Sequence, residues 1–427
     1  MNKIGNLFKG DKGIWTVFLF LCLISVVEVF SASSTLTYKS QNYLSPLLYH
    51  CVTILLGVLV AIVTLNIPCR YFKLMTPLML LLSYATLLGV LIFGESINGA
   101  NRVIQLPGFT FQPSEIAKGT MVLFTAQILS ALQREDGSGS DPLAMKYILW
   151  VTLPAVILIG LENLSTAVLL FAVIYTMMFL GRMPWKQMAK LTGGVLLCGA
   201  AFVGLVFLVG GMDKEAEQEL ADMQAGVSTE HAAKPTSKGR DKLEVFTHRF
   251  GTWRNRLMGL GGNSDPTDPK DYKITDKNFQ VTHANLAIAS SGFIGKGPGN
   301  SVERDYLPQA FSDFIYAIII EELGLLGAIL VAILYIILLF RAAHIANYCE
   351  NAYPAFLVLG LALLMVTQAL FNMGVAVGLA PVTGQPLPLV SRGGTSNIIT
   401  CFYLGIILSI SRFSDKRKTT KKELATE

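Results

Sequence analysis

This sequence has few charged residues. Only 15% of its 427 residues are Asp, Glu, Lys or Arg, whereas a soluble domain carries about 25%. Hydrophobic residues make up 52% of the chain and gather in runs of roughly twenty, the length of a membrane span. This composition excludes a soluble enzyme and a disordered chain, and it predicts a multi-pass membrane protein.

Cysteine and histidine are also scarce. The six cysteines form no CxxC pair, and the five histidines are dispersed with no metal-ligand spacing. A zinc site or a disulfide framework is therefore not expected, and the cysteines are interpreted as small buried side chains. The net charge of +5 is spread between apolar runs rather than gathered in one patch, which argues against nucleic-acid binding.

The apolar runs predict an all-α fold of ten transmembrane helices. The first follows three lysines and could resemble a signal peptide, but it is too long and lacks a cleavage site, so we interpret it as a retained helix. Glu162 and Asn163 must form a tight turn between the fifth and sixth spans. The ten expected spans are 14–33, 47–67, 74–94, 114–132, 147–162, 165–181, 191–211, 313–340, 353–377 and 395–411.

Lys and Arg in alternate short loops predict the orientation. An even number of spans places these loops and both termini on one side, which the positive-inside rule makes the cytoplasm. We therefore expect a single polytopic domain over 1–427, with a basic cytoplasmic tail at 412–427 and a large extracytoplasmic loop at 212–312.

That large loop has segments of different character. Residues 215–223 could form a short acidic helix, and 226–239 are polar. Residues 242–260 set aromatic and leucine side chains among Lys and Arg, which favours an interfacial amphipathic helix over a loop packed on the bundle. Asp265, Asp268 and Asp271 do not have the spacing of a calcium loop.

Asp313 is the most informative acidic residue. Pro308 ends the preceding loop, Ser312 is a candidate helix N-cap, and Asp313 would then lie in the first helical turn. Two interpretations remain open from residue type alone: a capping carboxylate, or a general base at the boundary between membrane and water.

Further charged residues lie at the ends of spans. Glu115 and Lys118 are three residues apart and share a helix face, where they could form an ion pair or line a site. Arg102, next to glycine, suits phosphate binding but is also a common interface anchor. Glu321 lies two turns beyond Asp313 and could equally make a structural ion pair.

Two glycine- and proline-rich segments complete the pattern. The stretch 292–300 is glycine-rich but lacks the context of a nucleotide-binding loop, so it is expected to permit close backbone approach. The loop 378–396 is expected to dip back into the bundle. At this level the chain could be a transporter or a lipid-processing enzyme.

Six motifs together resemble the SEDS family of cell-wall polymerases, whose best known members are FtsW and RodA. They span most of the chain in the family's order. The motifs are Asn98–Arg102, Phe111–Lys118, Gly297–Ser301, Leu307–Phe314, Glu321–Gly324 and Pro381–Ser396.

The resemblance implies a peptidoglycan glycosyltransferase that polymerises lipid II, a disaccharide-pentapeptide on undecaprenyl pyrophosphate, on the outer face of the bacterial inner membrane. It implies partnership with a class B penicillin-binding protein transpeptidase and, for a member acting at the division septum, with other divisome proteins. Asp313 matches the family's catalytic residue, and the expected substrate-binding residues are Arg102, Gln112, Glu115, Lys118 and Glu321. No cofactor is certain; the departing pyrophosphate needs Arg, Lys or a divalent cation.

The chain departs from the family at three places. Phe311 stands where a His or a similar residue is usual, Glu162-Asn163 replaces a Pro-Asp pair, and Arg392 replaces a Tyr. The Gly-x-Gly-Asn-Ser stretch favours FtsW and division over RodA and elongation. A lipid II flippase that uses the same cavity, and a scaffold without chemistry, remain the alternatives.

Overall fold

The computed structural model describes residues 9–33, 45–93, 95–97, 100–106, 109–134, 139–225, 278–307 and 310–424. The chain divides into two compact units, the first formed by Met1–Pro184 with Ile274–Glu427 and the second by Trp185–Lys273. The predicted helix at 242–260, the polar stretch 226–239 and the aspartates at 265–271 lie outside the described residues.

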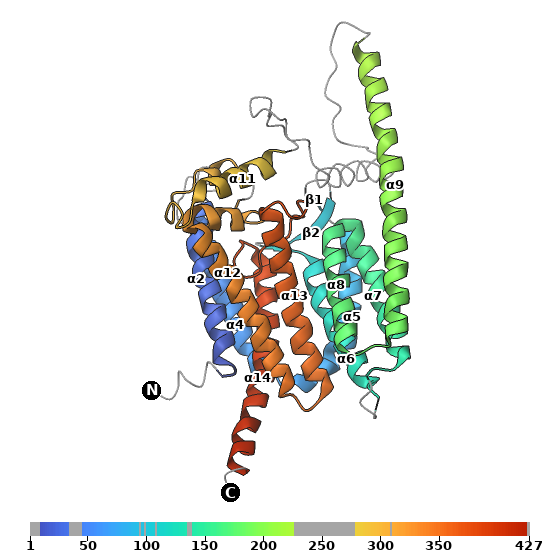
Figure 1. The fold of residues 1–427 in the computed structure, drawn as a ribbon, viewed down its shortest axis with the longest axis vertical. Helices are drawn as coiled ribbons and strands as arrows, with labels where there is room; N and C mark the ends of the chain where they lie inside the picture. Colours follow the sequence, from blue (N-terminus) through green and yellow to red (C-terminus); the bar gives the residue numbers. More distant parts are fainter. Residues whose placement is uncertain are drawn as a thin grey trace. The chain divides into compact units, whose positions relative to one another are not determined.

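Each of the ten expected spans coincides with a helix, of which α12 is interrupted at Gly324 (Figure 1). Eight of them are long and apolar enough to cross a membrane, which makes the chain a multi-pass membrane protein. Of the other two, α8 has only 17 residues and α6 carries the charged residues Glu115 and Lys118. The ten helices are α2 (Lys12–Ala32), α4 (Ser45–Leu65), α5 (Cys69–Phe93), α6 (Pro113–Ala131), α7 (Pro142–Glu162), α8 (Leu164–Leu180), α9 (Trp185–Ala225), α12 (Ile315–Asn347), α13 (Ala352–Ala376) and α14 (Gly394–Leu424).

Local sequence signals set several helix ends. Asp141 caps α7 by accepting a hydrogen bond from the Leu143 N–H, and Pro142 fills the first helical position. Asn163 is the single residue between α7 and α8, and its side chain caps α8, which confirms the tight turn. In the second unit, α9 is continuous through residue 225, so the segment 215–223 extends the expected seventh span instead of forming a separate helix.

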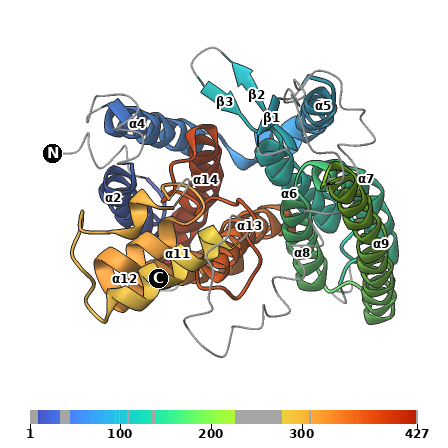
Figure 2. The ribbon, with the colours of Figure 1, turned by 90° about the horizontal axis from the view of Figure 1, so that it is seen from above.

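Within the first unit, helices far apart in sequence pack together (Figure 2). The helices α4 and α14 approach each other closely: a Cβ added at Gly405 would lie 2.7 Å from the Cβ of Thr64. Long apolar side chains such as Leu74 and Ile92 point outward with 76% and 73% of their surface exposed. Such surfaces are suited to lipid.

The segment between α5 and α6, for which the sequence predicted no regular structure, contains strands. It forms a three-stranded antiparallel sheet of β1 (Glu95–Ile97), β2 (Ala100–Leu106) and β3 (Phe109–Phe111). Apart from these short strands and one isolated bridge, the described regular structure is helical. The sheet pairs the backbone groups of β2 with its two neighbours, and this pairing is not visible in the hydrophobic pattern.

Two irregular features shape the end of the bundle that holds Asp313. Gly324 interrupts α12 with φ of 68°, and the segment that follows α11 (Phe279–Ser291) crosses at this break. The loop between α13 and α14 is buried in its later part, where Thr383, Gln385, Leu387 and Ser391 are each 2% exposed or less, whereas Leu379 at its start is 82% exposed. Backbone without regular structure is tolerated at such depth because protein groups satisfy it.

The cysteine prediction was only partly correct. All six are free thiols, but only Cys22 and Cys401 are buried, while Cys198 is exposed.

Candidate active site

Asp313 lies in a turn directly before α12. The helix begins at Ile315, and its N-cap is Phe314, with no side-chain cap, so the prediction that Ser312 is the N-cap was wrong. Ser312 instead donates its hydroxyl to Asp313 Oδ1 at 2.8 Å. Asp313 therefore stands two residues before the first helical residue, which weakens the capping interpretation.

Three hydrogen bonds fix the backbone around Asp313. Asn372 on α13 donates its amide to the Asp313 carbonyl at 2.9 Å. From the α13–α14 loop, the Ser391 hydroxyl donates to the Ser312 carbonyl at 2.6 Å, and the Arg392 N–H donates to the Phe311 carbonyl at 2.9 Å. The half-buried Asp313 thus sits on a support built by two distant segments.

The same loop is bonded to the predicted residues of α6. Lys118 Nζ lies 2.8 Å from Glu115 Oε1 and 2.8 Å from Gln368 Oε1, and the Gln368 amide donates to the Pro386 carbonyl at 3.0 Å. Lys118 is fully buried and Glu115 is 2% exposed. Their shared helix face is confirmed, and the two charges compensate each other.

Two side-chain amides of this network each have an oxygen that accepts no hydrogen bond from the described residues. Asn372 also donates to the Gln385 carbonyl at 2.7 Å, and Gln385 donates to Thr166 on α8 at 2.5 Å. The oxygens Asn372 Oδ1 and Gln385 Oε1 are buried without a partner among the described residues. A buried acceptor without a donor costs about 1–3 kcal/mol, so a donor from water or a substrate hydroxyl would be favourable here.

Gln112 and Arg102 lie near the start of α6. Gln112 is the N-cap of that helix without a capping side-chain bond, and its amide donates to Ser114 Oγ at 3.1 Å. Arg102 belongs to β2, where the structure describes the backbone alone.

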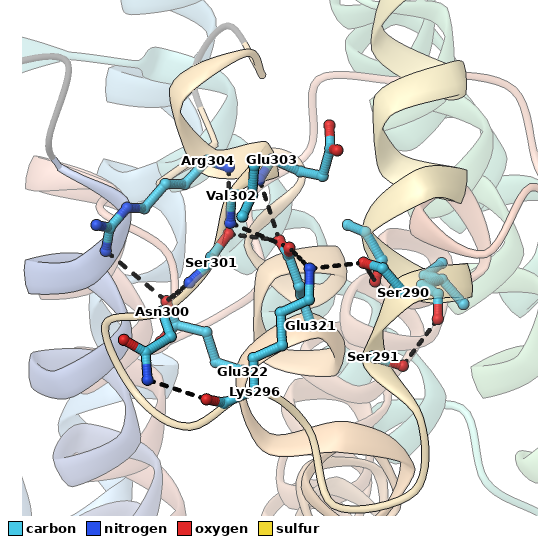
Figure 3. Close-up of polar contacts among 12 residues, drawn as sticks. Ser290, Ser291, Lys296, Asn300, Ser301, Val302, Glu303, Arg304, Glu321 and Glu322 are labelled. Carbon is cyan, nitrogen blue, oxygen red and sulfur yellow. Dashed lines mark hydrogen bonds and ion pairs between the residues drawn. The ribbon is translucent and has the colours of Figure 1, made fainter.

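Glu321 and Glu322 serve a different part of the molecule (Figure 3). Glu321 accepts from Lys296 Nζ at 2.6 Å and from the N–H groups of Val302 and Glu303 at 3.1 and 3.3 Å. Both glutamates are fully buried. The oxygens of Glu321 are therefore engaged by the segment 296–303, which matches the structural ion pair that the sequence left open.

Glu322 completes this attachment. It accepts from the Gly299 N–H at 2.9 Å and the Ser301 N–H at 3.3 Å, and from the hydroxyl of Ser31 on α2. Arg304, which follows this segment in the sequence, also donates to Ser31 Oγ at 2.8 Å. The glycine-rich segment is thus held by carboxylates from the first part of α12 rather than by bound phosphate.

Sequence reasoning missed the amides that assemble the site. Gln368 and Asn372 are four residues apart in an otherwise apolar span, so they share one face of α13. Polar residues inside a span are rare and usually face the bundle interior, and that signal could have identified both.

No metal centre emerges from the part of the chain that the structure describes. No three His, Cys, Asp or Glu side chains there come together to hold an ion.

Comparison with known proteins covers nearly the whole chain. The family FTSW_RODA_SPOVE, described as "Cell cycle protein", matches residues 11–217 and 246–416. A protein of Hahella chejuensis named "Probable peptidoglycan glycosyltransferase FtsW" is 30% identical over 412 residues, covering 95% of this chain and 91% of that protein. A protein of the same name from Halomonas elongata is 29% identical over 411 residues, covering 94% and 90%.

Two solved structures share the fold at 22% identity. One, described as "Structural coordination of polymerization and crosslinking by a peptidoglycan synthase complex", has a TM-score of 0.66 and covers 95% of this chain and 98% of its own. The other, the rod shape determining protein RodA of Thermus thermophilus, has a TM-score of 0.60 with the same coverage.

Proposed function

Because this chain belongs to the FtsW/RodA/SpoVE family of cell cycle proteins, we propose that it is a peptidoglycan glycosyltransferase that polymerises lipid II into glycan strands. The observation that carries the proposal is the position of Asp313, a half-buried carboxylate ahead of α12 on a backbone fixed from two distant segments. A general base must be held within hydrogen-bond reach of the proton that it removes, and a rigid support provides this.

The proposed reaction uses Asp313 as the base. Asp313 accepts the proton of a hydroxyl on the acceptor sugar while that oxygen bonds to the sugar carbon that carries the undecaprenyl pyrophosphate. The bond from that carbon to the pyrophosphate oxygen breaks, and the electron pair leaves with the pyrophosphate. A single displacement of this kind inverts the configuration at the carbon.

The other predicted residues receive different roles. Because Lys118 is buried and compensated by Glu115, it positions the α13–α14 loop through Gln368 and does not itself meet the pyrophosphate. Arg102 and Gln112, at the same end of α6, remain proposed substrate contacts. Glu321 positions the segment 296–303 instead of touching substrate.

The setting of the reaction is also part of the proposal. The ten helices cross the bacterial inner membrane with both termini in the cytoplasm, and the site opens on the outer face. In this proposal a class B penicillin-binding protein crosslinks the product, and the enzyme acts at the division septum with other divisome proteins. The resemblance of the Gly-x-Gly-Asn-Ser stretch to FtsW supports this role. The relatives named FtsW support division over elongation.

The decisive experiment supplies purified lipid II to the purified protein, with and without its cognate transpeptidase. We expect glycan strands longer than a disaccharide to form when the wild-type protein is present and not to form without it. A protein that moves lipid II between leaflets of a vesicle without lengthening glycan would be a flippase, and the proposal would fail.

A further inference from the structure

Arg392 is a cation whose charge the described residues do not balance. It follows Ser391 in the α13–α14 loop, and its side chain is half-buried. None of the ion pairs between described residues includes it. By contrast, Lys296, Arg304 and Lys118 each face a carboxylate.

Two aromatic rings hold the guanidinium in place. Its central carbon lies 5.5 Å from the ring centroid of Tyr49 on α4 and 5.4 Å from that of Phe311. Contacts to ring faces use the positive charge and leave the N–H donors free. The side chain is therefore oriented while its hydrogen-bonding groups stay available.

This arrangement is attached to the Asp313 segment. The Arg392 N–H bonds to the carbonyl of Phe311, and Ser391 bonds to the carbonyl of Ser312, the residue before Asp313. The Cα atoms of Phe311 and Asp313 are two peptide units apart, at most about 7.6 Å. The guanidinium thus lies over a residue that is close to the proposed base.

Burial makes an unbalanced charge costly. Loss of water lowers the pKa of the Arg392 guanidinium from its usual value. A partly desolvated cation without an internal anion gains most from an anion supplied by a ligand. The planar fork of arginine matches phosphate oxygens in a bidentate manner, which lysine cannot do.

We propose that Arg392, clamped between Tyr49 and Phe311, binds the pyrophosphate of the undecaprenyl-linked substrate. The assignment rests on the proposed function, and it makes Arg392 a substrate contact that this chain has in place of the family's usual tyrosine. It also gives Phe311 a role as a positioning residue, because its ring supports the guanidinium next to Asp313. The two departures from the family pattern then form one unit.

The first arm of the test measures kinetics. Arg392→Gln should raise KM for lipid II about ten- to a hundredfold, the range for losing a charge-assisted hydrogen bond, with a smaller change in kcat. Arg392→Lys keeps the charge but loses the fork, so its KM should fall in between. Phe311→Leu should raise KM in the same direction, and this increase should vanish in the background of Arg392→Gln.

The matched control is Arg70→Gln. Arg70 also lies over a ring, that of Tyr71 at 5.0 Å, but at the start of α5 and exposed. It should leave KM and thermal stability unchanged. An unchanged KM in a folded Arg392→Gln or Arg392→Lys protein would show that the aromatic clamp is only structural and would overturn the proposal.

The second arm needs no polymerisation. Undecaprenyl pyrophosphate, titrated into protein in phosphatidylcholine nanodiscs, should raise the Tm of the wild type and of Arg70→Gln but not of Arg392→Gln. If phosphatidylglycerol gives the same shift, the arginine binds anionic phospholipid in general and the substrate assignment is wrong. A wild type that binds undecaprenyl pyrophosphate through Arg392 without polymerising would refute the proposed function and keep this site.

Discussion

Gly295 and Gly324 lie against each other so closely that neither position has room for a side chain. A Cβ on Gly324 would stand 2.4 Å from the Gly295 nitrogen, and a Cβ on Gly295 would stand 2.3 Å from the Glu322 carbonyl oxygen. The segment that crosses the break in α12 satisfies carbonyls there: the N–H groups of Lys296 and Gly297 donate to the carbonyls of Glu321 and Glu322 at 3.0 and 2.8 Å. The contact explains why α12 bends before the second, longer part of the helix.

Alanine at either glycine should therefore be strongly destabilising. A positive φ alone costs about 1–2 kcal/mol for an L-residue, and forced overpacking adds about 1–3 kcal/mol. Thermal unfolding in detergent measures the loss. The control is Gly292→Ala, which has a similar φ of +67° but nothing within 4 Å of the added atom. An equal loss in the control would show that backbone strain alone, and not the contact, decides stability.

Variants of Lys118 and Glu115 show whether this pair acts on stability or on catalysis. Removing one partner leaves the other as an uncompensated buried charge, so Lys118→Met should cost about 3–5 kcal/mol of stability. The double variant Glu115→Gln with Lys118→Met should recover much of that loss. Thermal unfolding and the amount of protein in the membrane measure both. A fully stable Lys118→Met protein with no polymerisation would instead assign Lys118 to the substrate.

Asp313→Asn separates the two interpretations of that residue. The amide is nearly isosteric but accepts no proton at neutral pH, so polymerisation should fall by about 10²–10⁴-fold. Because Asp313 precedes the helix start, the fold and the membrane content should not change. The assay compares glycan synthesis from lipid II by the variant and by the wild type, after thermal unfolding has shown that the two are equally stable. Activity above about a tenth of wild type, far outside that range, would make Asp313 structural.

Asp11, which bonds to Arg341 in the last part of α12, is expected to contribute to stability. Its carboxylate caps α2 by accepting from the Ile14 N–H and also accepts from Arg341 Nε, both at 3.0 Å. Asp11→Ala should cost about 0.5–2 kcal/mol for the cap, with a modest addition from the ion pair because Arg341 is 40% exposed. Thermal unfolding of Asp141→Ala, which removes a cap of α7, provides the comparison. Asp11→Ala should unfold at a lower temperature than this control, and the opposite order would leave the ion pair without a role.

The proposed orientation has a direct test. A reporter fused after Lys422 should be cytoplasmic, and one inserted near Lys234 should lie outside, because Lys and Arg gather in alternate short loops. Protease or membrane-impermeant label applied to intact cells reads the location. Access to the C-terminal reporter from outside would overturn the arrangement of ten spans.

The helices could be found from the sequence because their causes are local. A backbone in lipid must satisfy its own hydrogen bonds, so a long apolar run has little choice but helix. The turn at Asn163 lies where it was expected, whereas α7 begins at Pro142, five residues before the expected start, because Asp141 caps it. The sheet at 95–111 was missed because its strands are short and are stabilised by each other rather than by a periodic pattern.

The assembly of the candidate site was decided by tertiary structure. Residue types and motifs singled out Asp313, Glu115 and Lys118. They did not reveal that the buried Lys118 bonds to Gln368 across 250 residues of sequence, the contact that supports the proposed positioning role. The clamp of Arg392 between Tyr49 and Phe311 likewise joins three segments that no spacing connects. The chain therefore determined by itself where its helices and reactive residue types are, because hydrophobic length and capping act over a few residues. Only packing of the helices decided which charges are neutralised and which remain for a ligand, because the energy of a charge depends on the groups that surround it in space.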